Sequence, residues 1–222
     1  MSAKPRALDL SVDRARALAL TPVSAAAAKR LDQFVALFLQ WQDKINLVAA
    51  STLPQLWTRH IADSLQLLDH APDARIWVDF GSGGGFPAIP IACALAEKPG
   101  TLIHLVESTG KRAAFLRESV RVLGLPAKVH AVRIENFGDS FNGEVDVVTA
   151  RAVAPLKILC DQAFAFISRG AFGLFPKGQD IDAELTEAAK YWRIQADTVP
   201  SRTSAESAIV VVRQLEKRRQ SI

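Results

Sequence analysis

Apolar and polar positions divide the chain into a helical beginning and an alternating remainder. Apolar residues recur at helical spacing over 24–46, after a start signal at Thr21-Pro22, and a second helical pattern runs over about 54–69. Neither stretch contains a strand pattern. We therefore predict an N-terminal helical extension over residues 1–72, joined to the rest of the chain at the segment APDAR.

Short apolar runs then alternate with helical patterns. The runs predicted as strands are RIWVDF, TLIHLVE, AKVHAV, EVDVVTA, AFGLF, RIQADTV and SAIVVVRQL, and the helical patterns end near 96 or cover 111–123, 155–167 and about 180–191. Such alternation indicates a parallel sheet with right-handed crossovers. The last two runs leave no room for a helix, which predicts a hairpin and an antiparallel final strand. We expect an α/β domain over 73–216 and a basic tail over 217–222.

Composition excludes several classes of protein. Of the 222 residues, 49% are hydrophobic and 23% charged, as in ordinary globular chains. Four scattered histidines and two cysteines in apolar stretches predict no metal site and no disulfide framework. No apolar run reaches the roughly 18 residues of a membrane span, and no signal peptide is found. We expect a cytoplasmic protein without a membrane partner, whose net charge of +4 suggests nucleic acid.

Four glycines in five positions mark the first strand–helix junction, in the segment VDFGSGGGFPAIPIA. Gly81, Gly83 and Gly85 fit the spacing G-x-G-x-G, which is typical of S-adenosylmethionine-dependent methyltransferases. The dinucleotide pattern G-x-G-x-x-G would need a glycine in place of Phe86. We predict that these glycines let the backbone approach a cofactor near the start of the following helix.

Acidic and apolar residues at the next two strand ends support an adenosyl ligand. Glu107 ends the second predicted strand, where an acid accepts hydrogen bonds from ribose hydroxyls in nicotinamide-binding folds and methyltransferases alike. A solvated strand-end acid is the alternative. Ile134 and Glu135 follow the third strand and are placed to frame an adenine.

The ends of four consecutive predicted strands carry cations. In open α/β sheets ligands bind at this edge, so a polyanionic substrate such as RNA explains the charges better than chance. Two of them also stand at a helix N-terminus, where a cation is disfavoured by about 0.3–1 kcal/mol. The candidate RNA-binding residues of this rim are Lys111, Arg112, Arg133, Arg151 and Lys177.

Missing motifs narrow the chemistry. The fourth strand is followed by TARAVAP, which lacks the Asp/Asn-Pro-Pro-aromatic motif used on exocyclic amines, and no cysteine stands at a strand end as a nucleophile. An acceptor that is already nucleophilic, such as guanine N7, remains. The residues thus favour a methyltransferase acting on nucleic acid. The alternatives are a nicotinamide-dependent oxidoreductase and a cofactor-gated RNA-binding protein without catalysis.

Six segments resemble one known family in their order along residues 41–178: WQDKINLVA, RHIADS, VDFGSGGGFPAIPIA, ESTGKRAAFL, ARAVAPL and PKG. They are similar to the RsmG (GidB) family of bacterial small-subunit rRNA guanine-N7 methyltransferases. The resemblance implies a Rossmann-like class I methyltransferase fold with an N-terminal helical extension. It also implies methyl transfer from S-adenosylmethionine to guanine N7 at position 527 of 16S rRNA, with 16S rRNA or the small ribosomal subunit as partner.

The resemblance also implies roles for individual residues. Gly81 and Phe86 would contact the cofactor, and Ile134 and Glu135 would lie along its adenine. Glu107 stands where some members of the family have Asp, a change that a ribose acceptor tolerates. The segment NLV departs from the family's Asn-Leu-Thr, which removes a hydroxyl at that point.

N7 methylation needs no general base, so we name no catalytic base. Arg151, at the end of the fourth predicted strand, is the candidate catalytic residue. The resemblance implies that it reaches the cofactor or the reacting base; the alternative is a structural arginine paired with Asp79 or Glu135. The family signature on the extension has two interpretations of equal weight, substrate contact and a polar cluster that anchors a helix. Its residues are Arg59, His60, Asp63 and Ser64.

Overall fold

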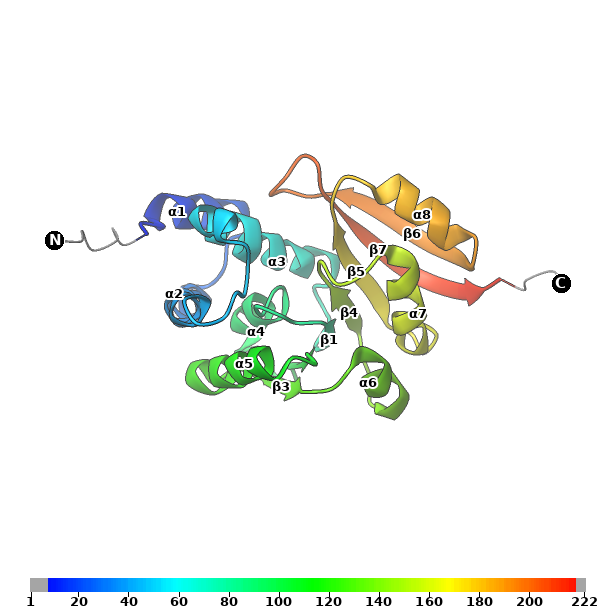
Figure 1. Cartoon of the computed structure of the whole chain (residues 1–222), viewed down its shortest axis with the longest axis horizontal. Helices are drawn as coiled ribbons and strands as arrows, with labels where there is room; N and C mark the ends of the chain where they lie inside the picture. Colours follow the sequence, from blue (N-terminus) through cyan, green and yellow to red (C-terminus); the bar gives the residue numbers. More distant parts are fainter. Residues whose placement is uncertain (1–7, 219–222) are drawn as a thin grey trace.

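The computed structural model describes residues 8–218 (Figure 1). Its strands are β1 (Ile76–Phe80), β2 (Leu102–Val106), β3 (Ala127–His130), β4 (Val147–Ala150), β5 (Phe172–Lys177), β6 (Trp192–Pro200) and β7 (Ala208–Lys217). The α-helices are α1 (Ser11–Leu20), α2 (Ala25–Gln42), α3 (Asp63–Leu65), α4 (Ala88–Leu95), α5 (Gly110–Leu123), α6 (Ile134–Ser140), α7 (Leu156–Ile167) and α8 (Ile181–Ala189).

The strands form one seven-stranded sheet in the order β3-β2-β1-β4-β5-β7-β6. Strands β1 to β5 are parallel, while β7 runs antiparallel to both β5 and β6, so the predicted closing hairpin is confirmed. The chain winds outward from β1 in one direction and from β4 in the other. The carboxyl ends of β1 and β4 therefore form the switch point at which open α/β sheets bind ligands.

Alternate side chains of the strands pack into two hydrophobic cores, one on each face of the sheet. On β1, Trp77 packs with α4, α5 and the extension, whereas Val78 and Phe80 pack with α7 on the opposite face. This period of two follows from the pleat of a strand buried on both faces. On the first face, Phe34 and Phe38 of α2 are fully buried against the rings of Phe86 and Phe115. Helix α2 of the extension thus packs on α4 and α5, the helices that cover this face of the sheet.

The extension is less regular than its apolar pattern predicts. The single helix expected over 54–69 is instead a succession of short segments: the 3₁₀ helix η1 (Ala50–Gln55), the π-helix η2 (Trp57–Ala62), α3, and the 3₁₀ helix η3 (Gln66–His70). The start of η2 is held by Asp13 of α1, whose carboxylate accepts from the N–H groups of Trp57 and Thr58. A contact between residues so far apart in sequence leaves no trace in local periodicity.

Two helices were not predicted, and the end of the chain is only partly described. Helix α1 precedes the predicted start signal, and the short α6 lies between β3 and β4. Strand β7 extends to Lys217, where the basic tail was expected, and residues 219–222 of that tail lie outside the described residues. Within residues 8–218, no helix combines the length and apolar character that crossing a bilayer requires. The same range holds no group of three side chains arranged for a metal ion.

Candidate active site

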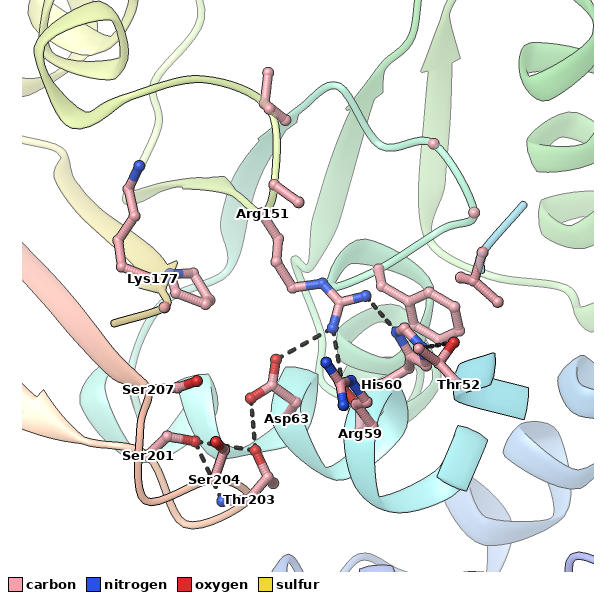
Figure 2. A pocket seen from close by; sticks show the side chains of 18 of the residues that line it. Thr52, Arg59, His60, Asp63, Arg151, Lys177, Ser201, Thr203, Ser204 and Ser207 are labelled. Carbon is pink, nitrogen blue, oxygen red and sulfur yellow. Dashed lines mark hydrogen bonds and ion pairs between the residues drawn. The ribbon is translucent and has the colours of Figure 1, made fainter. Parts of the chain in front are cut away.

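A cavity of about 990 Å³ opens at the carboxyl ends of β1, β4 and β5 (Figure 2). Its lining comes from the extension between residues 47 and 63, the glycine loop, the segment 151–155 after β4, the end of β5 with Glu184 of α8, Arg112 of α5, and the β6–β7 hairpin from residue 201 to 209. The sheet topology places the glycine loop beside the segment after β4, as the sequence predicts. The hairpin was not expected to reach this cavity.

The glycine loop is shaped by contacts that side chains would prevent. Gly81 has φ +63°, and a Cβ atom there would lie 2.8 Å from a methyl carbon of Val153. The N–H of Gly83 donates to Glu107 Oε2 at 3.0 Å, and the N–H of Thr109 donates to Oε1 at 2.7 Å. Glu107 is 5% exposed and keeps further lone pairs after these two bonds. It therefore holds the loop and can still accept from a bound hydroxyl.

Asp79 lies directly beneath the loop. It is almost fully buried on β1, and Thr149 of the neighbouring strand donates its hydroxyl to Asp79 Oδ1 at 2.7 Å. Its other oxygen, Oδ2, has no hydrogen-bond partner among the described residues. Burial raises the pKa of Asp79 to about 7, against the smaller opposing effect of the hydroxyls of Ser82 and Thr149. The buried carboxyl therefore takes up a proton more readily than an exposed aspartate does.

Arg151 crosses from the end of β4 to the extension (Figure 2). One nitrogen, Nη1, donates to Asp63 Oδ2 and to the carbonyl of Arg59, both at 3.2 Å, and Nη2 donates to His60 Nδ1 at 2.6 Å. The alternative that pairs Arg151 with Asp79 or Glu135 named the wrong acid, because the strand-end side chain turns toward the extension. The guanidinium has five N–H groups, so two stay uncommitted beside the cavity.

His60 continues this network away from Arg151. A guanidinium only donates, so His60 Nδ1 is an acceptor and its proton is on Nε2, which donates to Thr52 Oγ1 at 2.9 Å. The Thr52 hydroxyl donates onward to the carbonyl of Ala49 at 2.7 Å. Burial, then the charges of Arg151 and Arg59, lowers the pKa of His60 to about 3. The imidazole is therefore neutral at physiological pH.

The cations of the predicted rim fall into two groups. Lys177 is turned away from the Arg151–Asp63 pair (Figure 2), and its ammonium donates to Glu184 Oε2 at 2.7 Å and to a backbone carbonyl. With a side chain only 9% exposed, it is engaged by the protein rather than presented to an anion, unlike the expectation for this residue. Arg112 of the rim and Arg59 of the extension line the cavity and form no ion pair within residues 8–218. Both are available to an anionic ligand.

Several predicted residues lie beside the cavity rather than in its lining. Ile134 and Glu135 begin α6, where Glu135 is exposed and accepts from Gln162 at 3.0 Å. Gly85 is buried behind the loop, against Ile89. Other such residues are Glu107, which contacts the loop from behind, and the exposed Lys111 and Arg133.

The hairpin turn is the part of the site that the sequence did not reveal. Its Thr203 hydroxyl donates to Asp63 Oδ1 at 2.7 Å, on the carboxylate that also binds Arg151. Gln66, 2% exposed on η3, bonds Ser201 Oγ and the N–H of Arg202. The segment PSRTSAES is rich in turn-forming hydroxyl residues, but nothing in it indicates a partner some 140 positions earlier.

Comparison with known proteins identifies the family. The model of the family GidB, described as rRNA small subunit methyltransferase G, matches residues 27–210. The chain belongs to this family. It is 57% identical over 208 residues to the ribosomal RNA small subunit methyltransferase G of Bradyrhizobium sp. strain BTAi1, covering 94% of both chains. It is 55% identical to the namesake protein of Rhodopseudomonas palustris strain BisB18, covering 96% of this chain and 91% of that one.

Solved structures show the same fold at low sequence identity. An O-methyltransferase from Bacillus cereus in complex with SAH superposes with a TM-score of 0.57 at 16% identity, covering 91% of this chain and 96% of that one. Cofactor-bound Rv0187 from MTB gives 0.59 at 18% identity, covering 95% and 99%. The predicted Rossmann-like class I methyltransferase fold with N-terminal helices is thereby confirmed.

Proposed function

We propose that this protein transfers a methyl group from S-adenosylmethionine to N7 of a guanine in 16S rRNA, at position 527 as the family resemblance implies. The support is membership of a small-subunit rRNA methyltransferase family together with a cavity at the switch point of a methyltransferase fold. The small ribosomal subunit or its 16S rRNA is the macromolecular partner.

The residues around the glycine loop fit this cofactor. The bare backbone at Gly81 and Gly83 leaves room for a ligand to approach, and Glu107 retains lone pairs for ribose hydroxyls. When bound, S-adenosylmethionine supplies an electrophilic methyl group on a sulfonium.

The chain's own residues orient the reactants and need not move a proton. Guanine N7 attacks with its lone pair, so no base is required, and His60 is neutral with its acceptor nitrogen already bonded to Arg151. Arg59 and Arg112 both line the cavity and are available to phosphates of the RNA. The rate would come from orientation and from exclusion of water.

Labelled methyl transfer tests the proposal. Purified protein is incubated with methyl-labelled S-adenosylmethionine and unmodified small subunits, with free 16S rRNA in parallel, followed by nucleoside analysis. We expect 7-methylguanosine. Cofactor binding without any methylated nucleoside would overturn the proposal in favour of the non-catalytic RNA-binding protein.

Two glycine variants separate loss of the cofactor cradle from loss of fold. Gly81→Ala brings a Cβ within 2.8 Å of Val153, whereas Gly124→Ala, also at positive φ, meets nothing within 4 Å. Both strain the backbone by about 1 kcal/mol. We expect only Gly81→Ala to weaken S-adenosylhomocysteine binding and lower methyl transfer. Equal effects of the two substitutions would remove the glycine loop from the cofactor site.

A further inference from the structure

One part of the cavity, called the second compartment below, is lined by residues that belong neither to the glycine loop nor to the extension. Its walls come from the segment after β4, the end of β5, the start of α8 and the hairpin turn, and they include Pro155, Pro176, Glu184 and Ser207. The full volume of about 990 Å³ is at the upper limit for a site that holds one small ligand. A cofactor on the glycine loop therefore leaves room for a second group here.

Glu184 is the acid of this compartment and is held in one orientation by Lys177 of β5 and by the start of α7. Its Oε2 accepts from Lys177 Nζ at 2.7 Å and from the N–H of Leu156, the first residue of α7, at 2.5 Å. Lys177 is fixed in turn by the carbonyl of Ala154 at 2.8 Å. The other oxygen, Oε1, accepts no hydrogen bond from any residue within 8–218, and the side chain is 28% exposed. A preorganised acceptor thus lines the cavity.

The charges of the compartment favour a neutral ligand with hydrogen-bond donors. The Lys177 ammonium is compensated by Glu184, so it offers little to a phosphate, and the remaining acceptor capacity belongs to a carboxylate. Among the RNA bases, guanine alone presents two adjacent donors on one edge, N1–H and the 2-amino group. Adenine and cytosine present a ring-nitrogen lone pair there, which a carboxylate repels. Pro155 and Pro176 add apolar surface for a base.

We propose that this compartment is the acceptor-nucleotide subsite and that Glu184 selects guanine by accepting from its N1–H and 2-amino group through the free lone pairs of Oε1. The inference rests on the proposed function and adds the residue that reads the base. N7 lies on the other side of the purine ring system from these two donors, so a guanine anchored at Glu184 keeps N7 unobstructed. Bases that are flipped into enzyme pockets are commonly read at this edge.

Inosine provides the test, because it lacks only the 2-amino group and keeps N7. Small subunits are reconstituted with 16S rRNA, joined by splinted ligation, that carries guanosine or inosine at the methylated position. For the wild-type protein we expect kcat/KM to fall about 10- to 100-fold on inosine, the usual discrimination by a bidentate contact. Equal rates on the two nucleotides would overturn the subsite, without any need for a variant.

Glu184→Gln is then measured on both substrates. It should lower kcat/KM about 10- to 100-fold on guanosine but only slightly further on inosine, because the lost contact is the same one. An equal loss on both nucleotides means that Glu184 only supports Lys177 and α7, and it would overturn the inference. S-adenosylhomocysteine affinity should not change. Glu187→Gln is the matched control, since Glu187 lies on the same helix and pairs with Lys190 at the surface.

Failure of this inference is distinguishable from failure of the proposed function. If the wild-type protein forms no 7-methylguanosine on guanosine-containing subunits, the reaction itself is wrong. If it forms that product but is indifferent to the 2-amino group, the reaction stands and Glu184 does not read the base.

Discussion

Arg151 joins three parts of the molecule through one guanidinium. It leaves the end of β4, bonds Asp63 and His60 on the extension, and lies with Cζ 5.3 Å from the centre of the Phe86 ring on the glycine loop. A planar fork suits this role, because it can donate in several fixed directions at once. The two uncommitted N–H groups beside the cavity allow it to contact the cofactor as well.

Arg151→Lys tests whether the fork or the charge matters. Lysine keeps the charge but cannot reach Asp63 and His60 together, so we expect methyl transfer to fall about tenfold or more, from the loss of one or two hydrogen bonds. The control is Asp63→Asn, which weakens the link to the extension while leaving Arg151 in place. Calorimetry should show weaker S-adenosylhomocysteine binding for Arg151→Lys only. Near-normal single-turnover methylation by folded Arg151→Lys would exclude the functional role.

The sequence could predict which residues reach the cavity only where they directly follow a strand. Gly81, Gly83 and Arg151 reach the cavity because parallel strands bring their carboxyl ends to one edge. Local sequence could not show that Lys177 would turn inward to Glu184, since the pairing depends on how α8 packs. For the same reason it could not show the network from Arg151 to Thr52.

At the scale of elements, periodicity predicted all seven strands and the closing hairpin. It failed where an element depends on distant support. Helix α1 has a weakly amphipathic sequence and is fixed by the bond of Asp13 to η2. The β6–β7 turn has the sequence of an ordinary polar loop, yet it docks on α3 and η3 and forms one wall of the cavity.

The docking of this turn depends on buried contacts more than on exposed charge. Gln66→Ala would remove one partner of Ser201 Oγ and the acceptor of the Arg202 N–H. Because Gln66 is only 2% exposed, we expect the free energy of unfolding to fall by about 1–3 kcal/mol. Arg202→Ala removes a half-exposed pair with Asp69 and a long bond to the carbonyl of Leu20, so its cost should be at most about 1 kcal/mol. Urea denaturation compares the two. A larger loss for Arg202→Ala would assign the docking to the ion pair.

Across the whole molecule, buried titratable groups make stability depend on pH in opposite directions. Burial lowers the pKa of His60 to about 3 and that of His104 to about 4, so below about pH 6.5 the unfolded chain binds protons that the folded protein does not. Acidification from 6.5 toward 4 therefore favours unfolding. Burial raises the pKa of Asp79 to about 7 from 3.8, so this group binds its proton more tightly when folded, and it opposes the histidines over almost the same range.

Asp79→Asn isolates these contributions. Each such group changes the free energy of unfolding by about 1.4 kcal/mol per pH unit over the range where it is protonated in only one of the two states, folded or unfolded. The lowered pKa values of the buried and half-buried histidines outweigh the one aspartate, so stability falls as pH drops from 6 to 5. Removing Asp79 should steepen that fall by about 1.4 kcal/mol per pH unit, because the opposing proton uptake disappears while the surface carboxylates stay the same. Urea unfolding of both proteins at pH 5, 5.5 and 6 measures it, and parallel slopes would show that Asp79 is ionised in the folded protein throughout this range.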